Sequence, residues 1–410
     1  MSGKFEKYAT IPGHPRWDEL TGRQYELYGR ADDIRTPFGR DYTRVLHSLA
    51  FRRLKHKTQV FFNAGDNDHI CTRIEHVLHV ESVSSTIAEY LGLNSELTKV
   101  ISMAHDLGHA PFGHQGEKIL NSLTNEYLGA DFWHERNGLY ITDNIELLED
   151  SERNLRGLNL TYAVRDGIIS HCGEVDSNGL FPREELFDLA EFDAPGKYEA
   201  STWEGCVVKL ADKIAYLGRD LEDARRMGII NNDQLKELEE ATGLKGEAAN
   251  TTVIMHNAII DLCHNSSPGD GLRMSDDTFR QITEIKNFNY KNIYLSPKLL
   301  EINKKAEENL KVLFLGLDNM YSGARTINRL VKDYEDVKVA ADFAMWLSQY
   351  CDMEAVVGSG LEEQAKICLN RKIYASLEDR KTYRRAVIDF IAGMTDIYAE
   401  NAYGEIICLS

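Results

Sequence analysis

The stretch AHDLGHAPFGHQGE at residues 104–117 carries three histidines, an aspartate and a glutamate within 14 residues. The wider segment from His76 to His134 holds six of the 13 histidines of the chain in 59 residues, about three times their average frequency. Buried imidazole and carboxylate groups each need a partner, so such a cluster is poor material for a hydrophobic core. Any single histidine in it can be structural, but the cluster as a whole indicates a functional site.

This mixture of residues favours a divalent metal site. Imidazole and carboxylate ligands without thiolate suit Mn, Mg, Fe, Co, Ni or Zn. Because His105 and Asp106 are adjacent, the remaining ligands must come from distant segments. His76 lies on the preceding predicted helix, one turn after Arg73. Asp212 is the best candidate for a second carboxylate.

Asp212 belongs to the segment VVKLADKIAYLGRDLEDA at residues 207–224, which has helical periodicity. One face of that helix would hold the polar residues Asp212, Tyr216, Arg219, Asp220 and Asp223, opposite an apolar stripe. By spacing alone this is equally an ordinary solvated face of an amphipathic helix. A tyrosine and an arginine among aspartates, in a chain that has the histidine cluster, favour the wall of a pocket.

Helical periodicity dominates the rest of the chain and predicts an all-α fold. It places one helix around Ile74–Ile87 with Gly92 as its C-terminal cap, a second from Ser95 to about Gly108, and a third at about 204–227. Residues 173–203 and 264–276 look like loops, and residues 277–410 again look helical. We expect a polar N-terminal arm at 1–40, a catalytic domain at 41–230 and a helical C-terminal region at 231–410.

Composition and charge exclude several classes of protein. The formal net charge is −18, which argues against binding to anionic membranes and does not support single-stranded nucleic acid as a partner. The chain has no run of about 18 apolar residues and no apolar N-terminal segment, so we expect neither a membrane span nor a signal peptide. Seven scattered cysteines without a CxxC pair indicate a reduced, cytoplasmic protein. Neither a P-loop nor a GxGxxG motif is present.

The pattern formed by His76, His105-Asp106 and Asp212 resembles that of the HD-domain metal phosphohydrolases. The strings FRRLKHKTQVF (51–61), TRIEH (72–76), AHDLGHAPFGHQGE (104–117) and LADKIAYLGRDLEDA (210–224) resemble, more narrowly, the bacterial dGTPase-like deoxynucleoside triphosphate triphosphohydrolases. The resemblance covers about residues 35–230. It departs after the catalytic string, where bacterial members often have FEGN and this chain has FWHERNG at residues 132–138.

The resemblance implies an HD-domain helical fold with a helical C-terminal extension and metal-dependent hydrolysis of a dNTP, dGTP or another, to deoxynucleoside and inorganic triphosphate. It assigns the metal to His76, His105, Asp106 and Asp212. It makes His114 the acid or base beside the α-phosphate, with Glu117 orienting it and His109 as a further catalytic group. It assigns binding of the substrate phosphates to Arg73, Lys213 and His134.

For the sugar, the resemblance places Gln59 and Asp220 on the 3′-hydroxyl group. Val60 and Tyr216 would pack where a ribonucleotide carries its 2′-hydroxyl group. Without the resemblance, Gln59 and Val60 would be interpreted as ordinary surface and core residues. We also expect a homo-oligomer.

Two alternative functions remain open at this stage. An HD-type nucleotidase would use the same metal ligands but release inorganic phosphate from a nucleoside monophosphate. A catalytically weak nucleotide sensor would keep the fold without the chemistry. The presence of His114 and Glu117 argues against the sensor, since a sensor has no need of them.

Overall fold

The computed structural model describes residues 3–26, 32–62, 69–172, 178–244 and 251–409. These residues are predominantly helical, which confirms the predicted all-α fold class. Their strands are β1 (Leu147–Glu149) and β2 (Leu155–Gly157), an antiparallel pair in which Leu148 lies opposite Arg156. Within the described ranges, no helix combines the length and the apolar character that crossing a membrane requires.

The chain divides into two compact units, each assembled from separated stretches of sequence. The first comprises Met1–Leu46, Gln59–Asp106 and Asn159–Ile302, and the second comprises His47–Thr58, Leu107–Leu158 and Asn303–Ser410. The sequence analysis expected three consecutive parts instead, at 1–40, 41–230 and 231–410, and that assignment of domains stays a prediction.

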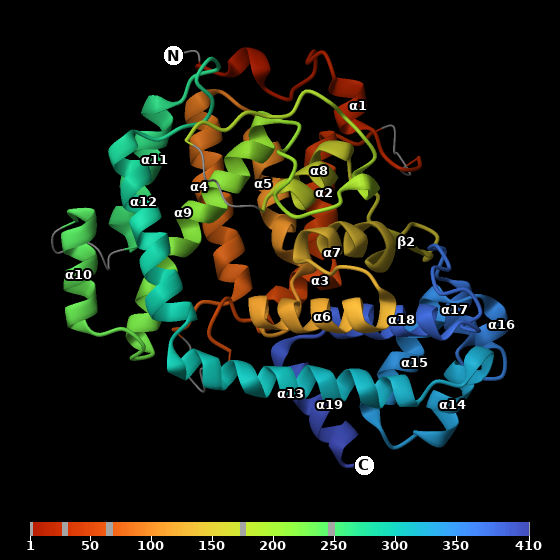
Figure 1. Ribbon diagram of the computed structural model, residues 1–410. Helices are drawn as coiled ribbons and strands as arrows, with labels where there is room; N and C mark the ends of the chain where they lie inside the picture. Colours follow the sequence, from red (N-terminus) through yellow and green to blue (C-terminus); the bar gives the residue numbers. More distant parts are fainter. Residues whose placement is uncertain (1–2, 27–31, 63–68, 173–177, 245–250, 410) are drawn as a thin grey trace. The chain divides into compact units, whose positions relative to one another are not determined.

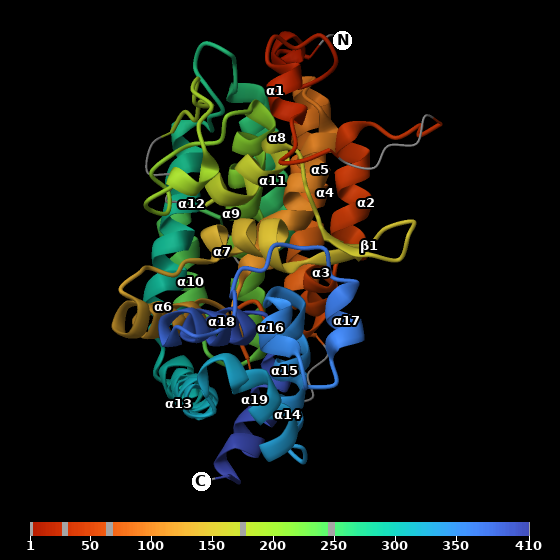
Figure 2. The same ribbon diagram turned by 90° about the vertical axis from the view of Figure 1, so that its right-hand side faces the viewer.

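Three helices, α4 (Arg73–Leu91), α5 (Ser95–Ala104) and α9 (Trp203–Arg226), pack together at the centre of the first unit. They lie side by side in Figure 1, and Figure 2 shows them again with α8 (Tyr162–Ser170) and α11 (Thr251–Asn265). The other elements that lie wholly in this unit are η1 (Glu6–Tyr8), α1 (Trp17–Thr21), η5 (Leu189–Glu191), α10 (Asn232–Thr242), α12 (Asp276–Asn289) and η6 (Tyr290–Tyr294). α2 (Pro37–His47), η3 (His105–Gly108) and α13 (Pro297–Asn319) continue into the second unit.

Local signals in the sequence fix the ends of these central helices. Thr72 and Glu75 form a capping box at the start of α4, and Gly92 ends it in the left-handed conformation at φ 82°. The Asn94 side chain accepts hydrogen bonds from the backbone at the start of α5, and Thr202 does the same for α9. Such a cap stabilises a helix by about 1 kcal/mol. The predicted helices therefore form close to their expected positions.

The N-terminal arm is less irregular than the sequence suggests. Phe5 is buried, with its ring centroid 4.8 Å from that of Trp203. Glu204 accepts hydrogen bonds from the backbone and hydroxyl group of Thr10. Helix α2 begins at Pro37, within the predicted arm, because proline suits the first position of a helix and the Thr36 hydroxyl group accepts a hydrogen bond from the Gly39 backbone.

The second unit is built largely from the C-terminal helices. In it α6 (Gly113–Leu128) packs on α18 (Arg380–Ala392), as Figure 1 shows. Besides β1 and β2, the other elements that lie wholly in this unit are α3 (Leu49–Arg53), η2 (Leu54–His56), α7 (His134–Tyr140), η4 (Ile141–Ile145), η7 (Gly323–Arg325), α14 (Thr326–Asp333), α15 (Lys338–Tyr350), α16 (Met353–Val356), α17 (Glu362–Lys366) and α19 (Asp396–Ile407). The prediction that residues 277–410 are helical is thus confirmed.

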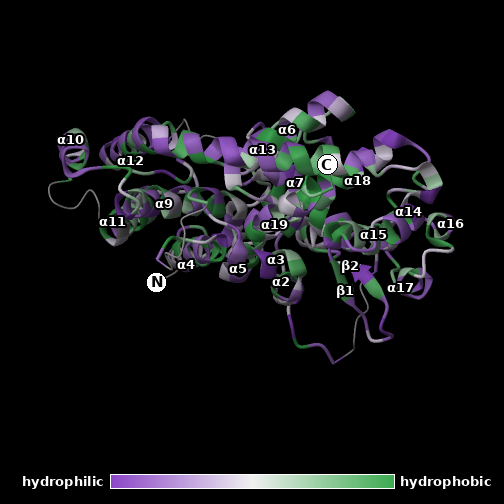
Figure 3. Cartoon of the chain, turned by 90° about the horizontal axis from the view of Figure 1, so that it is seen from below, coloured by the Kyte–Doolittle hydropathy of each residue, from purple (hydrophilic) through white to green (hydrophobic). Residues whose placement is uncertain are grey.

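The two predicted loops also form. Residues 178–202 are irregular apart from η5, whereas residues 173–177 of that prediction lie outside the described part of the chain. The break at 264–276 falls between α11 and α12. Hydrophilic residues run along most of α10 in Figure 3, which agrees with a helix that buries mainly Leu235 and Leu238.

Candidate active site

The four predicted metal ligands come together in the first unit. His76 on α4 has its Nε2 atom 2.9 Å from a carboxylate oxygen of Asp212 on α9. The Nε2 atom of His105 lies 3.4 Å from Asp106 and 3.9 Å from Asp212. Both histidines and Asp106 are buried, and Asp212 is partly exposed. Three helical elements thus converge on one small group of nitrogen and oxygen atoms.

The ring of His105 is oriented as a metal ligand requires. Its Nδ1 atom donates a hydrogen bond of 2.6 Å to the carbonyl oxygen of Ser102, which leaves the lone pair on Nε2. That Nε2 atom is buried and makes no hydrogen bond. A buried polar atom without a partner is costly, and a divalent cation would supply the missing interaction. The donor set of His76, His105, Asp106 and Asp212 therefore fits a divalent ion.

The charge state of Asp212 agrees with that role. Burial alone would raise the pKa of its carboxyl group. The hydrogen bond from His76 and the nearby imidazole of His105 lower it instead, to about 2. The group is therefore an ionised carboxylate at neutral pH, as metal coordination requires.

Arg73 lies beside this group. Its side chain is 1% exposed, and it donates a hydrogen bond of 2.9 Å to Asp106 and one of 3.3 Å to the backbone carbonyl of Gln59. The sequence analysis assigned Arg73 to substrate phosphate. That role stays a prediction; in the structure the Arg73 guanidinium contacts a predicted metal ligand and is well placed to fix the orientation of Asp106.

The polar face of α9 is buried where a solvated amphipathic helix would be exposed. Asp220 is 2% exposed, and the Tyr294 hydroxyl group donates to it. Burial raises the pKa of Asp220 to about 7, although the hydrogen bond from Tyr294 opposes that rise. Tyr216, which lies between Asp212 and Asp220 in the sequence, is half-buried. Burial also raises the pKa of its phenol. Asp223 instead accepts a hydrogen bond from the Cys71 backbone, a structural role.

The other predicted substrate residues of the first unit differ in how they are held. Gln59 is buried, and its side-chain carbonyl oxygen has no hydrogen-bond partner among the residues that the structure describes. Val60 is half-buried. Lys213 is buried, with its ammonium group 5.8 Å from the centre of the Phe279 ring. Of these three, Gln59 has the clearest capacity to bind a ligand.

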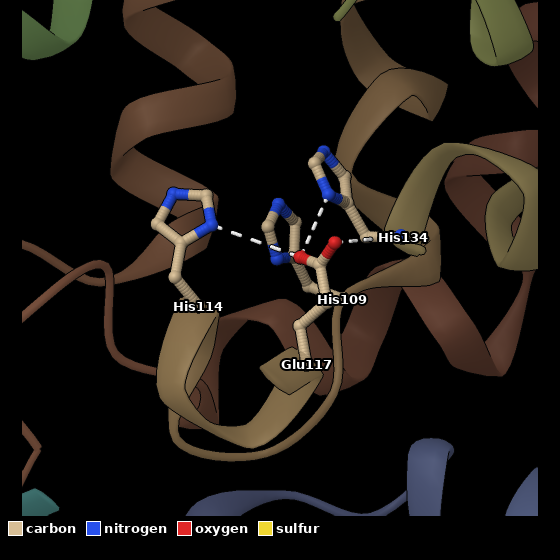
Figure 4. A group of neighbouring side chains, drawn as sticks. All are labelled: His109, His114, Glu117 and His134. Atoms are coloured by element: carbon tan, nitrogen blue, oxygen red, sulfur yellow. Dashed lines mark hydrogen bonds and ion pairs between the residues drawn. The ribbon is translucent and has the colours of Figure 1, made fainter. Parts of the chain in front are cut away.

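Figure 4 shows the second group, which lies in the second unit. Glu117 and His114 project from the first two turns of α6, and His134 begins α7. Glu117 lies 2.9 Å from the Nδ1 atom of His134 and 3.7 Å from that of His114. The His109 and His134 rings stack with centroids 3.9 Å apart. His114 and Glu117 are three residues apart on α6, but Glu117 is closer to His134.

These contacts set the charge of Glu117 and leave His114 accessible. Burial would raise the pKa of Glu117, but the neighbouring His134 and His114 hold it well below its usual range. The carboxylate is therefore ionised and can accept a hydrogen bond from either imidazole. The His114 side chain is 66% exposed. It is thus the member of the group most open to a substrate.

Two glycines of the quoted string allow this packing. A Cβ atom on Gly108 would lie 1.9 Å from the backbone oxygen of His134. A Cβ atom on Gly116 would lie 1.8 Å from the backbone oxygen of Pro111. Only glycine fits such close approaches of main chain. The glycines thus bring the segments of His109, His114 and His134 together.

The sequence analysis missed two residues of the first unit. His171 is 3% exposed, and its ring centroid lies 4.9 Å from that of His105. It can join His105 and Asp106 in a group of metal-ligating atoms that lie within 4.8 Å of one another. The second residue is Tyr294, the partner of Asp220. Both lie outside the histidine-rich segment, so only their position in the fold brings them to notice.

Comparisons with known proteins agree with this geometry. The HD domain family matches residues 73–217, and the phosphohydrolase-associated domain family matches residues 358–405. A "deoxyguanosinetriphosphate triphosphohydrolase-like protein" of Desulfatibacillum aliphaticivorans is 34% identical over 91% of this chain and 88% of its own length. This chain belongs to the deoxyguanosinetriphosphate triphosphohydrolase-like family.

Further members of the dGTPase-like family support the assignment. A protein of the same name from Caldanaerobacter subterraneus subsp. tengcongensis is 35% identical to this chain, over 76% of this chain and 81% of that protein. The one from Clostridium perfringens strain 13 is 31% identical, over 95% of this chain and 91% of that protein. The chain is therefore a hydrolase of the HD phosphohydrolase type.

Proposed function

We propose that the protein hydrolyses a deoxynucleoside triphosphate to deoxynucleoside and inorganic triphosphate in a metal-dependent reaction. The observation that carries this proposal is the convergence of His76, His105, Asp106 and Asp212, with the Nε2 atom of His105 buried and without a hydrogen bond. The name of the similar proteins supports dGTP, or another dNTP, as the substrate.

His76, His105, Asp106 and Asp212 would hold a divalent ion, which supplies Lewis-acid chemistry and activation of water when bound. Arg73 keeps Asp106 in place through their hydrogen bond of 2.9 Å. Only two residues separate Asp106 from His109. Their Cα atoms therefore lie within about 11 Å of each other in any conformation.

His114 would give a proton to the departing 5′-oxygen, and the ionised Glu117 would orient that imidazole. His109 and His134 would contact the phosphates. Lys213 would bind them as a cation. Each of these groups acts where negative charge develops during cleavage at the α-phosphorus.

For the sugar, Asp220 and Gln59 would bind the 3′-hydroxyl group, and Val60 and Tyr216 would exclude a 2′-hydroxyl group. The buried Gln59 side-chain oxygen, which has no hydrogen-bond partner, supports such a contact. Asp220 is held by Tyr294 and keeps a second oxygen available to a ligand. This arrangement would select deoxyribonucleotides by shape and reward their 3′-hydroxyl group by hydrogen bonding.

The test compares kcat/KM for a dNTP, the matching ribonucleotide and the matching 2′,3′-dideoxynucleotide. We expect the wild type to use the dNTP far faster than the ribonucleotide. Asp220→Ala should reduce the rate with the dNTP more than with the dideoxynucleotide, which cannot use the contact. Tyr216→Ala should narrow the preference for dNTP over ribonucleotide. Equal use of all three nucleotides by the wild type would refute the sugar site and favour a general nucleotidase.

We also propose that the protein is a homo-oligomer. Its mass in solution, measured by light scattering, tests this directly. A mass equal to that of one chain at all protein concentrations would contradict the proposal.

A further inference from the structure

The turn that carries His109 and leads to His114 has an unusual backbone. Phe112 has φ 64° and Gly113 has φ 58°, so two consecutive residues adopt the left-handed conformation. This conformation is unfavourable for a residue with a bulky side chain such as phenylalanine. It persists only where the surrounding structure holds it in place. The contacts that hold this turn therefore help to position the histidines on either side.

Asp396, the first residue of α19, makes one of these contacts. Its Oδ1 atom accepts a hydrogen bond of 2.9 Å from the Phe112 backbone N–H group. Its Oδ2 atom accepts from the backbone and the hydroxyl group of Thr58, at 2.9 and 2.8 Å. Asp396 is 7% exposed, and the positive end of the α19 dipole favours its charge. One carboxylate thus joins three segments of the second unit.

The helix itself does not need Asp396 as its cap. The N-cap of α19 is Thr395, whose hydroxyl group accepts from the backbone of Tyr398. Both oxygens of Asp396 are directed to other segments. Loss of the Asp396 side chain would therefore remove the contact with the turn but leave the N-cap of α19 in place.

Lys57 makes the second contact. Its side chain is buried, and its ammonium group donates to the backbone oxygens of His109 and Ala392. Ala392 is the last residue of α18, where the helix dipole favours a cation. Lys57 therefore holds the start of the turn, as Asp396 holds its end. We call this pair the Lys57–Asp396 clasp.

We propose that the Lys57–Asp396 clasp positions the catalytic turn, so that α18 and α19 set the placement of His109 and His114. Lys57 and Asp396 act on the turn through hydrogen bonds with its backbone, so both are positioning residues. The proposal rests on the proposed function, since it assigns the clasp a part in the same reaction. It also gives a role to the C-terminal segment matched by the phosphohydrolase-associated domain family, which includes Asp396.

The test uses the full-length protein and the variants Asp396→Ala, Thr58→Val and Asp379→Ala. Asp379 is the matched control, because this exposed aspartate accepts from the backbone and hydroxyl group of Thr382 at the start of α18 but does not contact the turn. Thr58→Val removes only the hydroxyl donor to Asp396 and serves as a milder change.

We expect Asp396→Ala to lower kcat for dNTP hydrolysis by about 10²-fold, the loss that a displacement of about 1 Å causes. KM and bound Mn should stay close to the wild-type values. Thr58→Val should give an intermediate kcat, and Asp379→Ala should leave kcat unchanged. A purely structural role would instead lower thermal stability and expressed protein without a selective loss of kcat.

Amide hydrogen exchange of the peptide that spans residues 109–116 gives a second readout that does not need activity. Exchange should be faster in Asp396→Ala than in both the wild type and Asp379→Ala. If the wild type hydrolyses no dNTP but this exchange pattern appears, the proposed function fails while the clasp stands. If the wild type is active and Asp396→Ala matches Asp379→Ala in both kcat and exchange, the clasp is overturned. If Asp396→Ala does not fold, Thr58→Val provides the test of the clasp. Wild-type kcat and wild-type exchange in Thr58→Val would overturn the proposal.

Discussion

His105 and His114 differ in the contacts and exposure of their rings. His105 is buried, with Nδ1 hydrogen-bonded to a backbone carbonyl and Nε2 directed at carboxylates. His114 is largely exposed and lies near Glu117. The first arrangement suits a metal ligand, and the second suits a group that exchanges protons with substrate and solvent.

His114→Ala should therefore separate proton transfer from metal binding. We expect kcat to fall by about 10²–10⁴-fold, which is typical for loss of a general acid or base. Bound metal should remain at the wild-type level, because His114 is not among the proposed ligands. The measurement pairs steady-state kinetics with metal analysis of the same purified protein. Loss of metal together with activity would make His114 a ligand and contradict its proposed role.

Much of the site could be predicted at this scale, but not all of it. Residue type and local spacing were enough to select His76, His105, Asp106 and Asp212, which do converge. They do not reveal that the guanidinium of Arg73 contacts Asp106. The partner of a long flexible side chain depends on which backbone lies within its reach, and the sequence does not contain that information.

At the scale of elements, capping residues explain why the helices were predictable. Thr72, Gly92, Asn94 and Thr202 mark helix ends through hydrogen bonds to nearby backbone. Contacts between distant segments had no such signal. Phe112 and Asp396 are 284 positions apart, and nothing in either local sequence indicates that they meet. The arm at the N-terminus was difficult for the same reason, since Thr10 meets Glu204 across 194 positions.

The contact of this arm with α9 predicts a dependence of stability on pH. Burial raises the pKa of Glu204, although hydrogen bonds from Thr10 and Asn94 oppose the rise. The folded protein therefore holds this proton more tightly than the unfolded chain, whose glutamates titrate near pH 4.3. The free energy of unfolding should fall as the pH rises from about 4.3 through the higher pKa of the folded state.

Urea unfolding of the wild type and of Glu204→Gln over this pH range provides the measurement. The glutamine cannot titrate, so the difference between the two proteins isolates the contribution of Glu204. We expect the wild type to lose stability relative to the variant as the pH rises. A difference that stays constant with pH would show that Glu204 has the same pKa in both states.

At the scale of the whole molecule, a net charge of −18 disfavours the approach of an anionic nucleotide, the proposed substrate. A bound divalent cation, together with Arg73, Lys213 and several histidines, would supply local positive charge for the nucleotide. Metal binding should then affect the entire fold, because a ligand that binds only the native state stabilises it by mass action.

Added Mn should therefore raise the melting temperature of the wild type, and EDTA should reverse the change. At a free metal concentration of 100 times Kd, the gain is about 2.7 kcal/mol. Asp106→Ala should bind no metal at this site and show no such shift. Asp193→Ala serves as the control, since it removes an exposed aspartate that pairs with Lys197 in a loop. A full Mn response in Asp106→Ala would move the metal to other residues, such as His109, His114, Glu117 and His134.

The identity of the products shows most directly whether the protein hydrolyses a dNTP to deoxynucleoside and inorganic triphosphate. Purified protein is incubated with dGTP and Mn, and the products are separated by anion-exchange chromatography. The account predicts deoxyguanosine and inorganic triphosphate in equal amounts, with no orthophosphate formed at early times. Release of orthophosphate, or of dGMP and pyrophosphate, would place cleavage at a different bond and contradict the proposed triphosphohydrolase.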